Sequence, residues 1–268
     1  MPDLSAMRGW IIDLDGVLWR GESPLPGAAD FLDRLRGRGA RFVLATNNAT
    51  ASPASVIRHL RRFGARARSE EVLTSALAAA AYLEGVLPAQ APVYAIGEAP
   101  LRAALAQRGF RLLDRADGAH AVVVGLDRRV NWRKLLEATL ALRAGALFIG
   151  TNPDPTFPHE RGQVPGNGAL LAALSVASGR DPTIVGKPES PLFRSALDLL
   201  GTRPEETVVV GDRLDTDILG GQRAGLHTAL VLTGVTRREA LPGVSPSPDW
   251  VFDGLPDLLR QLGPGEVP

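Results

Sequence analysis

Short apolar runs alternate with amphipathic stretches along most of the chain, and this alternation predicts strands that take turns with helices. The apolar runs are rich in β-branched residues and bounded by Gly, Asn or Asp, which is typical of strands buried on both faces of a parallel sheet. Strands are predicted at 10–12, 41–45, 93–96, 121–124, 147–149, 183–185, 207–210, 228–232 and 250–252. Helices are expected over 28–38, 53–63 and 75–86. The predicted fold class is therefore α/β.

Two segments that contain proline divide this pattern into parts. The segments 88–92 and 179–182 flank about three predicted strands and three helices, which is enough for a small α/β module. A chain of 268 residues is also long enough for two domains. Periodicity alone leaves open whether the module is an insertion or a second tandem domain.

The composition is that of an ordinary globular protein and argues against several function classes. Lys+Arg (30) nearly balance Asp+Glu (29), so neither nucleic acid nor a membrane surface is expected as a partner. The absence of cysteine excludes disulfides, thiolate metal sites and cysteine catalysis. The N-terminus is unlike a signal peptide, and no uncharged run reaches the roughly 18 residues that cross a bilayer. The expected location is the cytoplasm.

Two aspartates follow the first predicted strand, in the run Asp13-Leu14-Asp15-Gly16-Val17. Side chains two positions apart in a strand point the same way, so both carboxylates are expected to face one spot. Open α/β sheets bind ligands at the carboxyl ends of their strands, and a divalent cation relieves the repulsion between two close carboxylates. A polar turn with two ordinary surface aspartates is the alternative.

Polar residues also follow the second predicted strand, in the run Ala45-Thr46-Asn47-Asn48. A hydroxyl group and free backbone N–H groups in front of a helix can hold a phosphate. Thr and Asn serve equally well as helix N-caps, and taken alone this second interpretation is favoured.

A lysine follows the strand predicted at 183–185, in the run Val185-Gly186-Lys187-Pro188-Glu189. Only Lys187 and Lys134 are lysines, and every other basic residue is arginine. A compact ammonium group can contact a phosphoryl oxygen and a carboxylate together, where a planar guanidinium needs more room. A plain surface lysine in a loop is the alternative.

A further acidic run, Val210 to Asp217, begins at the end of the strand predicted at 207–210. Asp212 comes directly after the strand, and Asp217 lies in the first turns of the next helix, where it could serve merely as a cap. Together with Asp13 and Asp15, Asp212 offers a third oxygen ligand for Mg²⁺.

In this order, each at a strand end, the four runs resemble the motifs of the haloacid dehalogenase-like (HAD) phosphohydrolase superfamily. Thr46-Asn47-Asn48, Thr151-Asn152-Pro153-Asp154 and the run from Gly211 to Asp217 are similar to its NagD and 4-nitrophenylphosphatase subgroup. The resemblance covers nearly the whole chain, from about Arg8 to Leu262.

The resemblance implies a Rossmann-like, doubly wound parallel-sheet core with an inserted, smaller C2-type α/β cap. The core would comprise residues 1–77 and 185–268, and the cap residues 78–184. It also implies a phosphoric monoester hydrolase, a Mg²⁺-dependent phosphatase that acts on small phosphate monoesters through an aspartyl-phosphate intermediate.

The family mechanism implies a role for each matching residue. Asp13 would be the nucleophile, and Asp15 would protonate the leaving alkoxide and then activate water. Mg²⁺ would be held by the Asp13 carboxylate, the Asp15 main-chain carbonyl and Asp212. The residues that would hold the phosphoryl group are Thr46, Asn47, Asn48 and Lys187. Asp217 would lie behind them and orient Lys187 or a metal-bound water.

The cap would choose the substrate through the segment 151–168, with Asn152 or Asp154 near the leaving group; an Asx or proline turn there is about as plausible. Phe157 stands where similar animal pyridoxal-phosphate phosphatases carry a histidine, which argues against that substrate. The implied partner is a small phosphorylated metabolite, such as phosphoglycolate, a sugar phosphate or a nucleotide. A homodimer formed through the cap is implied by analogy.

Rival functions use related residues. A receiver-like phospho-acceptor module also gathers Asp, Ser or Thr, and Lys around Mg²⁺, but it needs neither an acid such as Asp15 nor a cap. A catalytically silent binding protein on this fold would be expected to lack Asp13. A phosphotransferase stays open, because it differs only in whether water or another hydroxyl takes the phosphoryl group.

Trp10, Trp132 and Trp250 are expected to pack in the interior, whereas Trp19 could contact the substrate.

Overall fold

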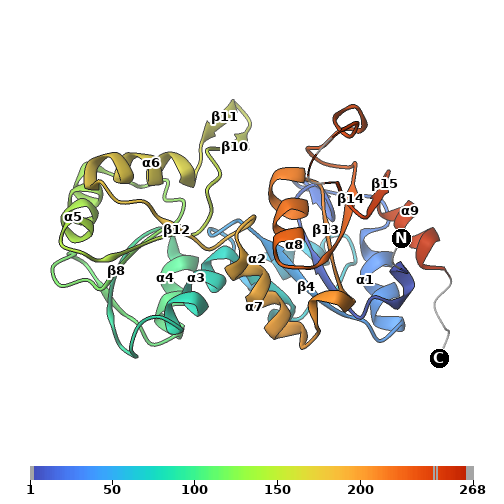
Figure 1. Ribbon diagram of the computed structural model, residues 1–268, viewed down its shortest axis with the longest axis horizontal. Helices are drawn as coiled ribbons and strands as arrows, with labels where there is room; N and C mark the ends of the chain where they lie inside the picture. Colours follow the sequence, from blue (N-terminus) through green and yellow to red (C-terminus); the bar gives the residue numbers. More distant parts are fainter. Residues whose placement is uncertain (1–2, 244, 246, 264–268) are drawn as a thin grey trace. The chain divides into compact units, whose positions relative to one another are not determined.

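The computed structural model describes residues 3–243, 245 and 247–263. Contacts divide the chain into two compact units (Figure 1). The first unit comprises Met1–Thr46, Pro53–Leu73 and Lys187–Pro268, and the second comprises Asn47–Ser52 and Thr74–Gly186. Whether residues 78–184 act as a separate cap domain stays a prediction.

A six-stranded sheet with the order β15-β14-β13-β1-β4-β5 forms the centre of the first unit. Strand β1 is central and pairs in parallel with both β13 and β4. The chain winds from β1 to β4 and β5 on one side and from β13 to β14 and β15 on the other, so the strand order reverses beside β1. Ligands bind at such a reversal in open α/β sheets. The strands are β1 (Gly9–Ile12), β4 (Arg41–Thr46), β5 (Val72–Thr74), β13 (Thr207–Gly211), β14 (His227–Val231) and β15 (Trp250–Phe252).

Helices cover both faces of this sheet (Figure 1). Helix α7 packs on β1 and β4 and α8 packs on β14, while α1 contacts β4 and α9 contacts β15. Helix α1 shows why the amphipathic pattern predicted it, since Phe31, Leu32 and Leu35 on its apolar side are fully buried. The helices are α1 (Ala28–Gly37), α2 (Pro53–Arg61), α7 (Ser190–Leu200), α8 (Leu219–Arg223) and α9 (Leu255–Leu262). Shorter elements are the 3₁₀ turns η1 (Leu4–Ala6), η2 (Ser69–Glu71), η3 (Pro204–Glu206) and η5 (Arg238–Ala240), the π-helical turn η4 (Leu214–Ile218), and the hairpin of β2 (Trp19–Arg20) and β3 (Ser23–Pro24).

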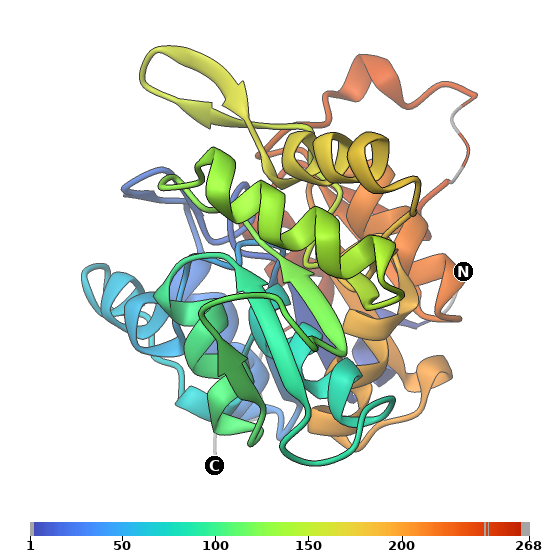
Figure 2. The same cartoon turned by 90° about the vertical axis from the view of Figure 1, so that its left-hand side faces the viewer.

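The second unit has its own parallel sheet of five strands, in the order β12-β9-β8-β6-β7. Helices α5 and α6 lie side by side on one face, and α3 and α4 pack together on the other (Figure 2). The strands are β6 (Pro92–Ile96), β7 (Arg111–Leu113), β8 (Ala121–Val124), β9 (Leu147–Gly150) and β12 (Thr183–Ile184), with an antiparallel hairpin of β10 (Thr156–His159) and β11 (Gly162–Pro165). The helices are α3 (Ser75–Glu84), α4 (Ala99–Gln107), α5 (Trp132–Arg143) and α6 (Asn167–Ser178).

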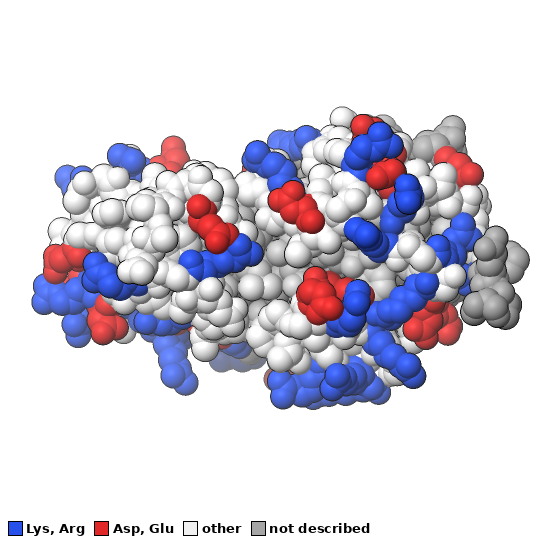
Figure 3. Space-filling view, turned by 90° about the horizontal axis from the view of Figure 1, so that it is seen from below, with Lys and Arg blue, Asp and Glu red and all other residues white. Residues whose placement is uncertain are grey.

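The predicted α/β fold class is confirmed, and every apolar run that predicted a strand forms one. Trp132 is a wrong prediction: it is the first residue of α5 and 75% exposed, because the interior side of that helix is occupied by Ala138 and Leu142. Among the described residues, no helix is both long and apolar enough to cross a membrane. On the faces drawn in Figure 3, basic and acidic side chains are intermixed on both units.

Candidate active site

The carboxyl ends of the central strands bring two aspartates together. Asp13 directly follows β1 and Asp212 directly follows β13. The two strands pair in parallel with Ile12 opposite Val210, and the Asp13 N–H donates to the Val210 carbonyl at 2.9 Å. The register therefore puts both carboxylates at the same edge of the sheet, beside the point where the strand order reverses.

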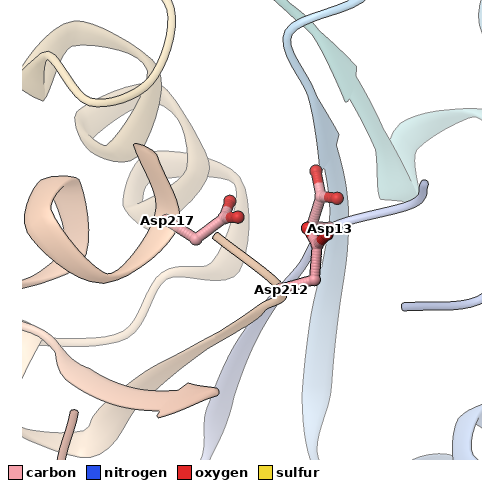
Figure 4. A group of neighbouring side chains, drawn as sticks. All are labelled: Asp13, Asp212 and Asp217. Carbon is pink, nitrogen blue, oxygen red and sulfur yellow. The ribbon is translucent and has the colours of Figure 1, made fainter. Parts of the chain in front are cut away.

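A third carboxylate joins them from the π-helical turn η4. Ligand oxygens of Asp13, Asp212 and Asp217 all lie within 4.8 Å of one another, and Figure 4 shows Asp217 pointing toward the other two. The Asp217 side chain is also tied to its own turn, because the Arg213 N–H donates to its Oδ2 at 3.3 Å. A π-helical turn widens the helical path by one residue and is frequent at functional sites.

Lys187 is buried among these carboxylates, with 3% of its side chain exposed. Its ammonium group donates to Asp13 Oδ1, to Asp217 Oδ1 at 2.7 Å and to the Ala45 carbonyl at 3.1 Å. Burial by itself lowers the pKa of Lys187, but the two carboxylates outweigh it and raise the pKa above its ordinary value. The lysine is therefore charged at neutral pH and has a partner for each of its three protons.

The acidic group carries more negative charge than one lysine neutralises. Burial, together with the neighbouring Asp217, raises the pKa of Asp212 to about 6. Burial likewise raises the pKa of Asp13 well above its usual range, with Asp217 and Asp212 adding to the effect, even though Lys187 opposes it. Crowded carboxylate oxygens of this kind are the ligands that Mg²⁺ prefers, so the residues present fit a divalent cation.

Two glycines leave room for the Asp212 carboxylate. A Cβ on Gly16 would lie 2.5 Å from Asp212 Oδ2, and one on Gly234 would lie 1.8 Å from it. Gly16 also has a φ of +85°, which disfavours other residues at this turn. The Val235 N–H donates to the same Oδ2 at 2.6 Å and orients the carboxylate.

Asp15 faces a different partner. Its side chain does not belong to the three-aspartate group, and the indole N–H of Trp19 donates to its Oδ1 at 2.9 Å. Asp15 is exposed, but the protein packed around it raises the pKa of its carboxyl group, and the Trp19 hydrogen bond opposes this rise. Thr46, at the end of β4, is buried next to Ala45, whose carbonyl accepts from Lys187.

The other predicted residues lie in the second unit and form a group of their own. The Asn47 carbonyl accepts from Asn152 Nδ2 at 2.8 Å and from Ser75 Oγ at 2.6 Å, and Asn47 Nδ2 donates to Asp154 Oδ2 at 3.3 Å. Asn48 differs, because its side-chain oxygen accepts from Thr50 in a local turn. The structure thus joins Asn47 to both residues predicted for the cap.

Sequence reasoning missed Trp19 as a partner of Asp15, the space left at Gly234, and Asn167. The Asn167 amide, buried at the start of α6, donates to the Asn152 carbonyl at 2.8 Å and to the Val124 carbonyl at 3.2 Å. The signal for Trp19 was its place four residues after Asp15, where a turn returns the side chain. No motif in the sequence around Gly234 or Asn167 indicated a functional role, and their contacts become apparent only in the folded structure.

Two family models match the chain, described as haloacid dehalogenase-like hydrolase over residues 10–111 and HAD-hydrolase-like over residues 184–258. The acid sugar phosphatase of Staphylococcus aureus is 40% identical over 255 residues, which cover 95% of this chain and 98% of that protein.

Solved structures agree with this match. A p-nitrophenyl phosphatase from Archaeoglobus fulgidus has a TM-score of 0.90 at 36% identity and covers 97% of this chain and 99% of its own. NagD from E. coli K-12 has a TM-score of 0.86 at 36% identity, with 93% and 97% covered. A glycerol phosphate phosphatase from Mycobacterium tuberculosis, in complex with magnesium, has a TM-score of 0.88 at 40% identity, with 98% and 78% covered.

Proposed function

Because the chain belongs to the haloacid dehalogenase-like hydrolases, in their NagD-like subgroup, and is a phosphoric monoester hydrolase, we propose that it hydrolyses small phosphate monoesters with Mg²⁺ through an aspartyl-phosphate intermediate on Asp13. The observation that carries this proposal is the contact of buried Lys187 with Asp13 and Asp217, beside Asp212. This arrangement holds a carboxylate nucleophile and positive charge in one place, as phosphoryl transfer requires.

In the first step, an Asp13 carboxylate oxygen attacks phosphorus as the bond from phosphorus to the leaving oxygen breaks. Asp15 gives its proton to that oxygen, so the product leaves as an alcohol. Lys187 is charged when the substrate binds, because Asp13 and Asp217 raise its pKa, and it offsets the negative charge of the phosphoryl group.

In the second step, water attacks the phosphorus of the aspartyl phosphate, and Asp15, now a carboxylate, takes the water proton. The bond from phosphorus to the Asp13 oxygen breaks, which releases phosphate and restores the Asp13 carboxylate. Asp15 regains the proton that it lost in the first step, so the cycle closes without another acid or base.

Asp13, Asp212 and the Asp15 main-chain carbonyl would hold Mg²⁺, with Asp217 beside them. The cation, when bound, neutralises charge on the phosphoryl oxygens and lets one anion approach another. Thr46, Asn47 and Asn48 would complete the phosphate site, with backbone N–H groups as donors, since the Asn48 side chain is engaged by Thr50.

Relatives named for sugar phosphates, glycerol phosphate and p-nitrophenyl phosphate support small monoesters as the substrate class. Asn152 and Asp154 would face the leaving group, held by Asn47 and Asn167. The amide group of Asn152 and the carboxylate of Asp154 suit a polyhydroxylated leaving group, because together they supply both donors and acceptors for hydroxyls. We therefore expect sugar and polyol phosphates to rank above apolar esters.

Phosphate release from a panel of monoesters tests the function and its metal requirement together. We expect turnover of 4-nitrophenyl phosphate, glycerol phosphate and sugar phosphates with Mg²⁺, and loss of at least about 100-fold with EDTA. Burial raises the pKa of Asp212 to about 6, so below that pH its carboxyl group is mostly protonated in the folded protein. Mg²⁺ must then displace this proton to bind. The Mg²⁺ concentration for half-maximal activity should therefore rise between pH 7.5 and pH 5.

Turnover that is unaffected by EDTA would contradict the metal requirement. An acceptor alcohol that captures the phosphoryl group in place of water would identify a phosphotransferase. If no monoester in the panel releases phosphate and a phosphodonor labels Asp13 stably, a receiver-like module would be favoured.

The outer face of α5 and α6 supports a homodimer formed through the second unit. Trp132, Leu140 and Val176 are 75%, 57% and 87% exposed, and no residue of α6 is charged. In a two-fold contact, each copy presents the same surface, so the uncharged helix α6 avoids repulsion where it meets its partner copy, and the large residues of α5 can pack against the small ones of α6. A groove of about 310 Å³ lies between the helices, lined by Trp132, Leu135, Leu136, Thr139, Ala173, Leu174 and Ala177.

Sedimentation velocity tests this contact. We expect the wild type to sediment as a dimer, and the Leu140→Glu, Val176→Glu double variant to sediment as a monomer with an unchanged unfolding temperature, because a charge would be buried at the interface. Val86→Glu is the matched control, since Val86 is 47% exposed elsewhere in the same unit. A wild type that is monomeric at all concentrations would reject the dimer.

A further inference from the structure

Trp19 lies against the carboxyl group that the proposed mechanism uses as acid and base. Its indole N–H donates to Asp15 Oδ1 at 2.9 Å, and the tryptophan itself is only 6% exposed. Among the described residues, no other side chain donates a hydrogen bond to this carboxyl group. The indole is therefore its one fixed protein partner in that part of the chain.

The backbone holds Trp19 at this distance. The turn after β1 closes with the Gly16 N–H donating to the Trp19 carbonyl at 2.7 Å and the Trp19 N–H donating to the Leu14 carbonyl at 3.3 Å. Thr233 Oγ1 donates to the Gly16 carbonyl at 2.6 Å and anchors the turn to the loop after β14. Main-chain hydrogen bonds thus tie Trp19 to the residues on either side of Asp15, in addition to the bond between the Trp19 and Asp15 side chains.

The indole ring is clamped by aromatic side chains from the end of α2 and the turn that follows it. The His59 ring meets it edge-on with centroids 4.7 Å apart, and Phe63 lies at 6.2 Å. His59 and Phe63 also contact each other, with centroids 5.8 Å apart. Three mutually packed rings leave the indole little freedom to rotate, so the direction of its N–H is set before substrate arrives.

An indole N–H can donate a hydrogen bond but cannot accept one. Asp15 Oδ1 therefore acts as the acceptor in both protonation states. The carbonyl oxygen of a carboxylic acid accepts better than its hydroxyl oxygen, so this contact favours the transferable proton on Oδ2. We propose that Trp19 is a positioning residue that reserves Oδ2 of Asp15 for proton transfer and aims it at the leaving oxygen. The inference rests on the proposed function, in which Asp15 is the acid and base.

The proton balance is simple. In the first step, the proton on Asp15 Oδ2 passes to the leaving oxygen as its bond to phosphorus breaks, and the Trp19 N–H stabilises the carboxylate that remains. In the second step, Oδ2 takes one proton from the attacking water. The indole N–H itself is never transferred.

The test compares leaving groups in the Trp19→Phe variant, which keeps a ring against His59 and Phe63 but removes the N–H. The quantity to measure is kcat/KM, which reports the steps through formation of the aspartyl phosphate. We expect the ratio of kcat/KM for glycerol phosphate to that for 4-nitrophenyl phosphate to fall about tenfold or more. An alkoxide needs a proton to leave, whereas 4-nitrophenolate departs without one.

Two further variants separate this role from a loss of packing. Asp15→Asn should lower the same ratio further, because it removes the acid itself. Trp10→Phe is the matched control: Trp10 is also buried, donates to the Met7 carbonyl at 3.3 Å and packs edge-on against Phe31. Its loss should affect stability while leaving the ratio unchanged.

A ratio that falls in Asp15→Asn but not in Trp19→Phe would overturn the inference and leave the proposed function standing. A wild type without phosphatase activity would overturn both. NMR supplies a second measurement that does not need a folded Trp19 variant: the indole N–H resonance of Trp19 should move in Asp15→Asn, while that of exposed Trp132 stays in place. An unmoved Trp19 resonance would also overturn the inference.

Discussion

Replacement of Asp13 by asparagine should lower phosphate release by at least about four orders of magnitude while the protein still folds. An amide oxygen is a poor nucleophile, so the aspartyl phosphate cannot form. Lys187 keeps Asp217 at 2.7 Å and the Ala45 carbonyl at 3.1 Å as partners, so no buried charge is left alone. Burial raises the pKa of Asp13, which means that burying its negative charge costs stability, and the neutral asparagine removes that cost. Phosphate release and the unfolding temperature, measured on the same preparation, check both parts.

The control for this substitution is Asp215→Asn. Asp215 lies in η4 beside Asp217, but its side chain is 68% exposed and pairs with Arg213 at the surface. We expect that variant to retain activity, because an exposed ion pair contributes little. Retained turnover in Asp13→Asn would remove Asp13 as the nucleophile, and a phosphorylated protein that persists in Asp13→Asn would point to another acceptor.

Sequence patterns predicted the large elements of the fold because each depends on local composition. The run 207–210, for example, is buried on both faces, and its continuous β-branched residues predict a strand from local sequence alone. The two-residue strands β2 and β3 were missed, since Trp19, Arg20, Ser23 and Pro24 carry no alternating pattern and pair only because a turn brings them together. Short strands of this kind are specified by tertiary contacts.

For the site, position at the strand ends predicted which carboxylates meet, but not how their charges are shared. Asp217 was expected to orient Lys187 or a metal-bound water, and in the structure its carboxylate accepts from the Lys187 ammonium group at 2.7 Å. The π-helical turn also brings a ligand oxygen of Asp217 within 4.8 Å of those of Asp13 and Asp212. A five-residue spacing does not distinguish an α-helix from a π-helix, so this detail was beyond the sequence. Lys187 was predicted from its rarity, while its burial between two carboxylates depends on strands that are distant in the chain.

Loss of Lys187 should reduce activity about as severely and should also destabilise the protein. In Lys187→Met, Asp13 and Asp217 face each other without a cation, and breaking such a buried pair costs about 3–5 kcal/mol. Lys187→Arg should fail to restore turnover, because the planar guanidinium cannot fit a pocket in which the side chain is 3% exposed and three acceptors surround one nitrogen. Phosphate release and urea unfolding without Mg²⁺ measure the two effects.

A second substitution separates charge balance from catalysis. Adding Asp217→Asn to Lys187→Met removes one of the stranded carboxylates, so the double variant should regain part of the lost stability and none of the activity. Lys134→Met is the matched control, since Lys134 pairs with Asp127 at 2.6 Å in the second unit and should leave turnover unchanged. If Lys187→Arg is fully active, the geometry of a compact ammonium group is not required. If the double variant is no more stable than Lys187→Met, Asp13 and Asp217 do not repel each other appreciably. Repulsion between these carboxylates would then be no argument for a cation at the site.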